Sequence, residues 1–241
     1  EMGLVYAQFN EMTEQIDYLI NQVYLQDIEN IRSELKFLQS QINHHFLFNC
    51  FNFIYQMSMA GNGVASADMA LYLGRYFRYS ITRQSDLTSL GDELDNIKIY
   101  LDICMMQYPQ KMAYDISLGD AWRDVNIPKL SVQPIVENAF AHGLKDRAGK
   151  GRIWIDGNED AICWCLCVHN DSRPFTSEEI KRINALVQSE EDGEGGYGLN
   201  NTHRRLRLYF GTAAGVKFCH DAERLETTVK IYIPKEGAAD V

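Results

Sequence analysis

Two adjacent histidines near the end of a long helical pattern are the first residues of this sequence that could do chemistry. His44 and His45 lie within the segment Gln41–Asn49. An imidazole titrates near neutrality, and its free ring nitrogen can attack a phosphoryl group. His45 shares the heptad phase of Ile31 and Leu38, which places it beside a coiled-coil seam. Taken alone, the pair is better explained by packed or solvated helix histidines.

A second group of polar side chains lies in the segment from Gln133 to Gly143. Glu137, Asn138 and His142 fall within about one helical turn of each other and are flanked by apolar residues. A helix with this pattern buries one face and points a carboxylate, an amide and an imidazole towards a site. Carboxylate and amide oxygens are suitable ligands for Mg²⁺. The alternative is a helix with polar residues on its solvated side.

A glycine-rich stretch directly before a helical run to Phe210 is the third candidate. It contains four glycines within six residues, namely Gly193, Gly195, Gly196 and Gly198. A mobile loop that enters a helix N-terminus can hold phosphates on its free N–H groups, although such a cluster by itself usually marks a flexible loop. The arginines that follow could neutralise charge or could form a solvated helix face: Arg204, Arg205 and Arg207.

Composition limits the classes of function. The 241 residues carry a net charge of −10, which argues against general nucleic-acid binding because the phosphate backbone requires a basic face. A nucleotide needs only a local cradle of donors, so ATP stays possible. No Cys-x-x-Cys pair occurs among the six cysteines, which argues against tetrahedral zinc. Cys163, Cys165 and Cys167 alternate, so their thiols should share one strand face, and we interpret them as buried thiols of a reducing cytosol.

The predicted secondary structure that must position these groups changes near residues 108–111, from helices alone to a mixture of strands and helices. Before that point, residues 1–48 predict one long coiled-coil helix, and two further helices are expected over 66–82 and 90–107. After it, strands and helices mix, which predicts an α+β sandwich. The expected strands are 112–118, 153–155, 162–168 and 227–233, and the expected helices are 131–142 and 177–187.

The order of the three chemical segments resembles that of sensor histidine kinases of the LytS/YesM type, over nearly the whole chain. Residues 41–49 resemble that family's Gln-Ile-Asn-Pro-His-Phe-Leu-Phe-Asn motif, which implies that His45 is the phosphorylated residue, with His44 in place of proline. Residues 133–143 resemble the N box. This match implies that Glu137 is the general base, that Asn138 holds Mg²⁺, and that His142 and Lys145 face phosphate.

Two further matches concern nucleotide binding. Residues 196–201 resemble the G2 box of the ATP lid, and Thr227-Thr228-Val229 is similar to the closing strand that reaches adenine. The ATP contacts that the resemblance implies here are Gly196, Gly198, Leu199, Asn201 and Thr228.

One segment departs from the family pattern. The G1 box of these kinases reads Asp-x-Gly-x-Gly, and its Asp accepts a hydrogen bond from the adenine amino group. The aligned stretch here is Asn170-Asp171-Ser172-Arg173-Pro174, so Asn170 replaces the Asp and both glycines are lost. This departure favours a kinase with weakened ATP binding, or a pseudokinase-like dimeric signalling scaffold.

The resemblance implies an organisation and a function. We expect a HAMP-like second helix and linker over 1–30, dimerisation and phosphotransfer helices over 31–109, and a Bergerat-type ATP-binding domain over 110–241. We expect a homodimer that uses ATP and Mg²⁺ to phosphorylate His45 and transfers the phosphoryl group to an aspartate of a response regulator. The chain lacks an apolar run long enough to span a bilayer and opens inside a helical pattern. It is therefore expected to be the cytoplasmic part of a protein anchored in the membrane upstream.

Overall fold

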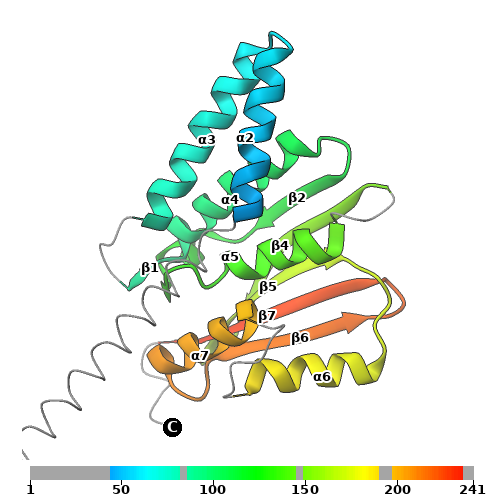
Figure 1. Cartoon of the computed structure of the whole chain (residues 1–241). Coiled ribbons are helices and arrows are strands. Elements are labelled where there is room, and N and C mark those ends of the chain that lie inside the picture. The colour runs from blue at the N-terminus through cyan, green and yellow to red at the C-terminus, as the bar shows by residue number, and fades with distance from the viewer. Residues whose placement is uncertain (1–43, 82–85, 145–148, 190–196, 236–241) are drawn as a thin grey trace, which may run out of the picture. The chain divides into compact units, whose positions relative to one another are not determined.

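The computed structural model describes residues 44–81, 86–144, 149–189 and 197–235 (Figure 1). The predicted linker over 1–30 and most of the predicted coiled coil lie outside these residues, as do Lys145 and Gly196. The chain forms two compact units, one that ends at Asn52 and one that comprises Phe53–Val241.

Helix α2 (His44–Met59) carries the two histidines at its described start. His44 and His45 are exposed, whereas Phe46 is buried. The helix continues to Met59, so the predicted end near residue 48 is wrong. It stops instead at the turn expected from Ala60-Gly61-Asn62-Gly63, where Gly61 adopts a φ of +74° that glycine tolerates at no steric cost.

Two more helices follow the turn. Helix α3 (Gly63–Ile81) packs against α4 (Leu90–Gln107), whose bounds agree with the sequence prediction. Ser89 caps α4 by accepting a hydrogen bond from the N–H of Asp92 at 3.0 Å. Helix α4 also contacts strand β2 (Met112–Ser117) and helix α5 (Gln133–Asn138). The predicted domain boundary after residue 109 thus falls inside the second compact unit and stays a prediction.

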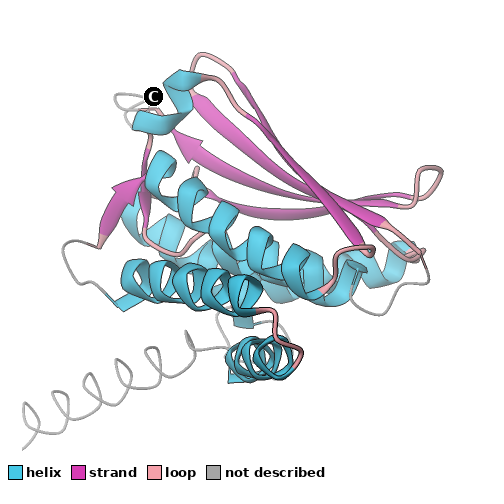
Figure 2. Ribbon diagram, turned by 90° about the horizontal axis from the view of Figure 1, so that it is seen from above, coloured by secondary structure: helices cyan, strands magenta, loops and turns pink. Residues whose placement is uncertain are grey.

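The main sheet has five strands in the order β2-β4-β5-β7-β6, drawn as the magenta layer of Figure 2. The parallel pair is β2 with β4, and the remaining pairs are antiparallel. Their bounds are β2 (Met112–Ser117), β4 (Gly151–Glu159), β5 (Cys163–Asp171), β6 (Gly215–Asp221) and β7 (Glu226–Pro234). The sequence prediction missed β6, and it missed the short antiparallel pair β1 (Leu87–Ser89) and β3 (Asn126–Pro128).

Helices cover one face of this sheet. They are α5 (Gln133–Asn138), which continues as a π-helix over Ala139–Leu144, then α6 (Ser177–Gln188) and α7 (Tyr197–Phe210); a 3₁₀ turn lies at Asp120–Asp124. Alternate strand residues on the covered face form the core, among them Ile153, Ile155, Leu166, Val168, Val229 and Ile231. The predicted α+β class is confirmed by these two layers. The predicted single helix over 131–142 is corrected to an α-helix that widens into a π-helix.

Helix α6 begins at Ser177, as predicted, with a capping box. The hydroxyl of Thr176 accepts the N–H of Glu179 at 3.2 Å, and the carboxylate of Glu179 accepts the N–H of Thr176 at 2.8 Å. Its C-terminus is held by Asn200, whose amide Nδ2 donates to the carbonyls of Leu186 at 2.9 Å and Ser189 at 2.7 Å. These contacts fix α6 beside the first turn of α7.

Candidate functional site

A cavity of about 510 Å³ lies between the helices and the covered face of the sheet. Its walls come from α5 and the π-helix, from α6, from the first turn of α7, and from β5, β6 and β7. The polar residues that line it are Asn138, His142, Asn170, Ser172, Arg173 and Thr227, and the apolar residues include Ile135, Val168, Phe175, Ile183, Leu199 and Phe218. A mostly apolar pocket with a few convergent polar groups is the usual form of a small-molecule site.

The structure brings five of the predicted site residues to this cavity: Asn138, His142, Asn170, Gly198 and Leu199. Glu137, Asn201 and Thr228 do not line it. His45 belongs to the other compact unit. Its ring nitrogen Nδ1 lies 3.3 Å from the amide Nδ2 of Asn49, one helical turn further on.

A buried carboxylate positions the helix that carries Glu137 and Asn138. Glu93 of α4 is fully buried and accepts the backbone N–H groups of Leu130 at 2.9 Å, Val132 at 3.0 Å and Gln133 at 3.3 Å. These donors lie at and just before the N-terminus of α5, where N–H groups lack partners within the helix. The Tyr79 hydroxyl donates to the same carboxylate at 2.7 Å. A buried charge with this many donors costs less to desolvate, so Glu93 can anchor α5 to α4.

The carboxylate of Glu137 is bonded to residues outside the cavity lining. Its Oε1 accepts a hydrogen bond from the Tyr76 hydroxyl of α3 at 3.1 Å and one from Gln133 Nε2 at 2.8 Å. Gln133 in turn accepts from Asn96 Nδ2 of α4 at 2.8 Å. This network joins α3, α4 and α5 at the residue that the motif identifies as a base.

Two glycines allow the backbone to lie close to the side-chain amides of Asn138 and Asn170. A Cβ added at Gly198 would lie 3.0 Å from Nδ2 of Asn138, and one added at Gly143 would lie 2.2 Å from Nδ2 of Asn170. The second distance is far shorter than any real Cβ contact, so Gly143 cannot be replaced without moving Asn170. Asn170 is buried, and its Nδ2 donates to the carbonyl of Asp171 at 2.8 Å. Its Oδ1 is then the atom suited to accept from a ligand.

The two neighbouring threonines of β7 point to opposite faces of the sheet. Thr227 lines the cavity, and its buried Oγ1 has no hydrogen-bond partner within the part of the chain that the structure describes. The hydroxyl of Thr228 lies on the other face, 2.8 Å from Nδ1 of His169. The resemblance implied Thr228 as the nucleotide contact, whereas the geometry favours Thr227. The alternation of residues along β7 could have identified Thr227 from the sequence, since it is in phase with the buried Val229 and Ile231.

Comparison with known proteins shows that the chain is similar to histidine kinases. Residues 33–112 match the family model described as histidine kinase. The chain is 28% identical over 234 residues to the sensor histidine kinase YesM of Bacillus subtilis, a match that covers 97% of this chain and 39% of YesM. It is 34% identical over 212 residues to the sensor histidine kinase YpdA of Escherichia coli K12, covering 85% of this chain and 35% of YpdA. The predicted resemblance to sensor histidine kinases is thereby confirmed.

The chain spans well under two thirds of the relatives it matches. Among solved structures, a nucleotide-free catalytic domain of the histidine kinase ThkA is similar, with a TM-score of 0.48, 14% identity, and coverage of 62% of this chain and 94% of that one. No helix among the described residues is both long and apolar enough to cross a membrane.

Proposed function

We propose that this chain is the kinase portion of a two-component sensor, which uses ATP to phosphorylate His45 and passes the phosphoryl group to an aspartate of a response regulator. The observation that carries this proposal is the cavity of the second unit. It is lined by Asn138, Asn170 and Thr227 together with Gly198 in the first turn of α7. The family of the relatives adds the reaction class. ATP, when bound, supplies the phosphoryl group, and Mg²⁺ neutralises charge on its phosphates.

The residues present fit an adenine nucleotide. The buried hydroxyl of Thr227 has no partner among the described residues, and such groups cost free energy unless a ligand or water satisfies them. Asn170 offers an amide oxygen to an exocyclic amino group from the same side of the cavity. Phe175 and Phe218, whose ring centroids are 5.4 Å apart, supply an apolar wall for a base.

Other residues that line the cavity suit phosphates and a cation. Asn138 would be the protein ligand for Mg²⁺, which commonly keeps several waters and uses only one or two protein groups beside the phosphates. His142, an exposed residue of the cavity lining, would contact phosphate together with Lys145. Gly196, Gly198, Leu199 and Asn201 are proposed as lid contacts by their match to the G2 box.

In this proposal Glu137 draws the proton from the attacking imidazole of His45. A positioned base typically contributes about 10²–10⁴-fold to the rate. The carboxylate is held by Tyr76 and Gln133 in this structure, so it must exchange those partners to act. Asn49, one turn after His45, orients the imidazole through its amide.

Labelled ATP with Mg²⁺ tests the proposal on the whole chain. His45→Ala should abolish incorporation of label, whereas His44→Ala should leave a measurable rate. The matched pair is informative because neighbouring helix positions point about 100° apart, so only one imidazole can face the phosphoryl group. Equal loss in both variants would contradict the assignment of His45.

We also propose the wider setting that the resemblance implies. Residues 1–30 would form a HAMP-like linker, 31–109 the dimerising phosphotransfer helices and 110–241 the ATP-binding domain. The chain would act as a homodimer on the cytoplasmic side of a membrane to which the complete protein is anchored. A monomer by light scattering at micromolar concentration would contradict the dimer.

A second candidate function rests on the altered G1 segment. Pro174 has no N–H to donate, and the N–H of Ser172 is already bonded to the carbonyl of Leu225 at 2.8 Å. This part of the cavity wall therefore offers fewer donors than a glycine-rich loop would. A dimeric scaffold that binds nucleotide poorly is the function that this observation favours. Calorimetric titration with ATP separates the two, because absence of binding at millimolar ATP would exclude the kinase.

A further inference from the structure

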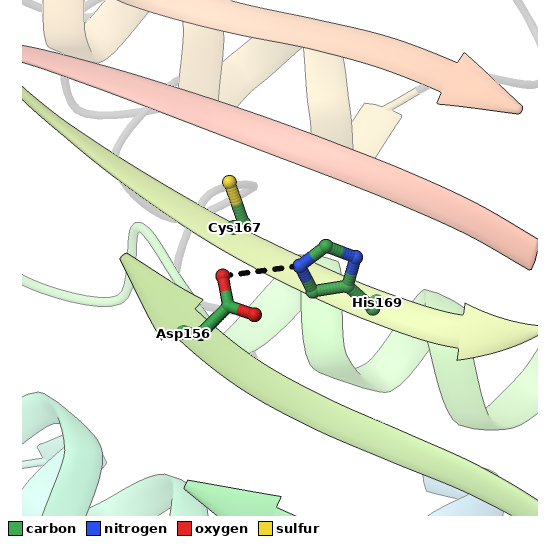
Figure 3. Close-up of side chains that lie close together, drawn as sticks. All are labelled: Asp156, Cys167 and His169. Atoms are coloured by element: carbon green, nitrogen blue, oxygen red, sulfur yellow. Dashed lines mark hydrogen bonds and ion pairs between the residues drawn. The ribbon is translucent and has the colours of Figure 1, made fainter. Parts of the chain in front are cut away.

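The face of the sheet opposite the nucleotide cavity carries a compact group of metal-ligating side chains. Asp156 comes from β4, and Cys167 and His169 come from β5 (Figure 3). Asp156 and Cys167 are directly paired in the antiparallel register. His169 lies two residues after Cys167, so the pleat places its side chain on the same face.

The distances within this group suit one cation. The carboxylate, thiol and imidazole atoms that could act as ligands all lie within 4.8 Å of one another. Asp156 Oδ1 and His169 Nε2 are 3.2 Å apart. Ligand atoms of a tetrahedral zinc ion are separated by roughly 3.3–3.8 Å, given Zn–N, Zn–O and Zn–S distances of about 2.0–2.3 Å. Small side-chain rotations would therefore bring all three to bonding distance of a shared ion.

The surroundings of His169 orient its Nε2 towards this position. Its other nitrogen, Nδ1, lies 2.8 Å from the hydroxyl of Thr228 and 3.2 Å from a carboxylate oxygen of Glu226, both on β7. Its ring stacks on Trp154 with a centroid distance of 4.9 Å and an interplanar angle of 1°. Histidine ligands of metals characteristically bond their second nitrogen to a carboxylate or another oxygen, which fixes the tautomer and the ring.

Burial and access also fit a metal centre. Cys167 is buried and the His169 side chain is 13% exposed, whereas the Asp156 side chain is 45% exposed. The group therefore has a dry side, formed by the strand, and an open side through which an ion can enter. Cys165 lies on the same face, with its sulfur 3.9 Å from that of Cys167.

We propose that Asp156, Cys167 and His169 bind a thiophilic divalent cation of the zinc class, with water in the fourth position. On binding, the Cys167 thiol releases its proton to solvent and its sulfur bonds to the ion, with no change in oxidation state. The sequence argued against tetrahedral zinc because it lacks a Cys-x-x-Cys pair. That spacing applies to ligands on one loop, whereas these ligands are brought together by strand register.

The site would reinforce the sheet rather than take part in phosphoryl transfer. It joins β4 to β5 through its ligands and reaches β7 through Thr228 and Glu226. The side chains of Val168 and Asn170, which alternate with those of Cys167 and His169 along β5, face the nucleotide cavity instead. The inference does not rest on the proposed kinase activity.

The test uses the whole chain after treatment with a chelator, followed by Co²⁺ or Zn²⁺ alone. We expect one equivalent to be retained, a thiolate-to-cobalt charge-transfer absorption, and a higher melting temperature with the metal than without it. Cys167→Ser should abolish the charge-transfer band, and Asp156→Asn should weaken retention at least tenfold. Glu226→Gln should weaken it by about 10–100-fold, as substitutions next to a metal ligand do.

Cys219→Ser is the matched control, since this cysteine lies on β6, directly opposite Thr228, outside the group. It should leave the band and the stoichiometry unchanged. Asp156→Asn keeps the shape of a half-exposed side chain. The retention measured with this variant therefore still tests the site if circular dichroism shows that Cys167→Ser is unfolded. Loss of metal on dialysis of the parent chain, or retention that neither Asp156→Asn nor Cys167→Ser changes, would overturn the site and leave a hydrogen-bonded histidine–aspartate pair.

Discussion

The hydroxyl of Tyr76 donates a hydrogen bond to Oε1 of Glu137 at 3.1 Å, so helix α3 holds the carboxylate that the motif identifies as the base. The two residues are 61 positions apart in the chain. Tyr76 also accepts from Gln133 Nε2 at 2.5 Å, which locks the hydroxyl into the network. A carboxylate held by two donors must give up these hydrogen bonds before it can act on another group.

Tyr76→Phe should therefore raise the rate of His45 phosphorylation. A hydrogen bond to a charged group contributes about 1.5–3 kcal/mol. Its loss should therefore increase the fraction of Glu137 carboxylates that are free to act on the imidazole by about tenfold or more. ATP affinity should not change, because Glu137 does not line the cavity. Initial rates with labelled ATP, beside Tyr72→Phe one turn earlier as the control, provide the measurement. A lower rate would show that Tyr76 places the base in its working position.

Thr227→Val should weaken nucleotide binding, whereas Thr228→Val should have little effect on it. A neutral hydrogen bond contributes about 0.5–1.5 kcal/mol, which corresponds to roughly twofold to tenfold in affinity. Without nucleotide, Thr227→Val should raise the melting temperature, since it removes a buried hydroxyl that has no partner among the described residues. Calorimetry and thermal melting check both parts. A greater loss of nucleotide affinity in Thr228→Val than in Thr227→Val would support Thr228 as the contact, as the motif implied.

Asn170→Asp should tighten ATP binding while destabilising the free protein. A carboxylate would accept from the adenine amino group in a charge-assisted bond, about twice as strong as a neutral one, for a gain of roughly 5–30-fold. The same change replaces the N–H donor to the Asp171 carbonyl with an oxygen, which should cost about 1–3 kcal/mol in the free protein. Inosine nucleotides, which lack the amino group, should gain nothing. Equal gains for ATP and ITP would exclude this contact.

His203 should make the fold sensitive to mild acid. Burial, with a smaller effect of Arg207, lowers the pKa of this imidazole below its ordinary value. Its Nδ1 accepts the N–H of Val216 at 3.0 Å, which requires a neutral ring. The unfolded chain binds a proton below about pH 6.5 while the folded chain resists it, so stability is complete above about pH 6.5 and falls as the pH drops towards the lowered pKa.

His203→Gln should consequently lose less stability than the parent between about pH 7.5 and pH 5.5. Melting temperatures at the two values give the comparison, and the exposed His44→Gln serves as the control. If the melting temperature of His203→Gln falls between the two pH values by as much as that of the parent, other groups cause the acid sensitivity.

The sequence by itself determined the α+β fold class, the bounds of α4, the start of α6 and the motif segments. Helix α4 was predicted at its observed bounds, and the structure shows that Ser89 caps its start. The helix predicted over 177–187 also begins where α6 does, and the capping box of Thr176 and Glu179 fixes that start locally. Asn138, His142 and Asn170 were recognised because their segments match family motifs, and all three line one cavity.

Only the tertiary structure decided which side chains meet. It showed that Glu137 is bonded to Tyr76, that Thr227 rather than Thr228 faces the cavity, and that Asp156 lies beside His169. A shift of one residue in strand register moves every side chain to the other face, so such contacts depend on pairing between distant segments. Periodicity and capping act over a few residues and can be recognised in the sequence, whereas register is set by the packing of the whole sheet against its helices.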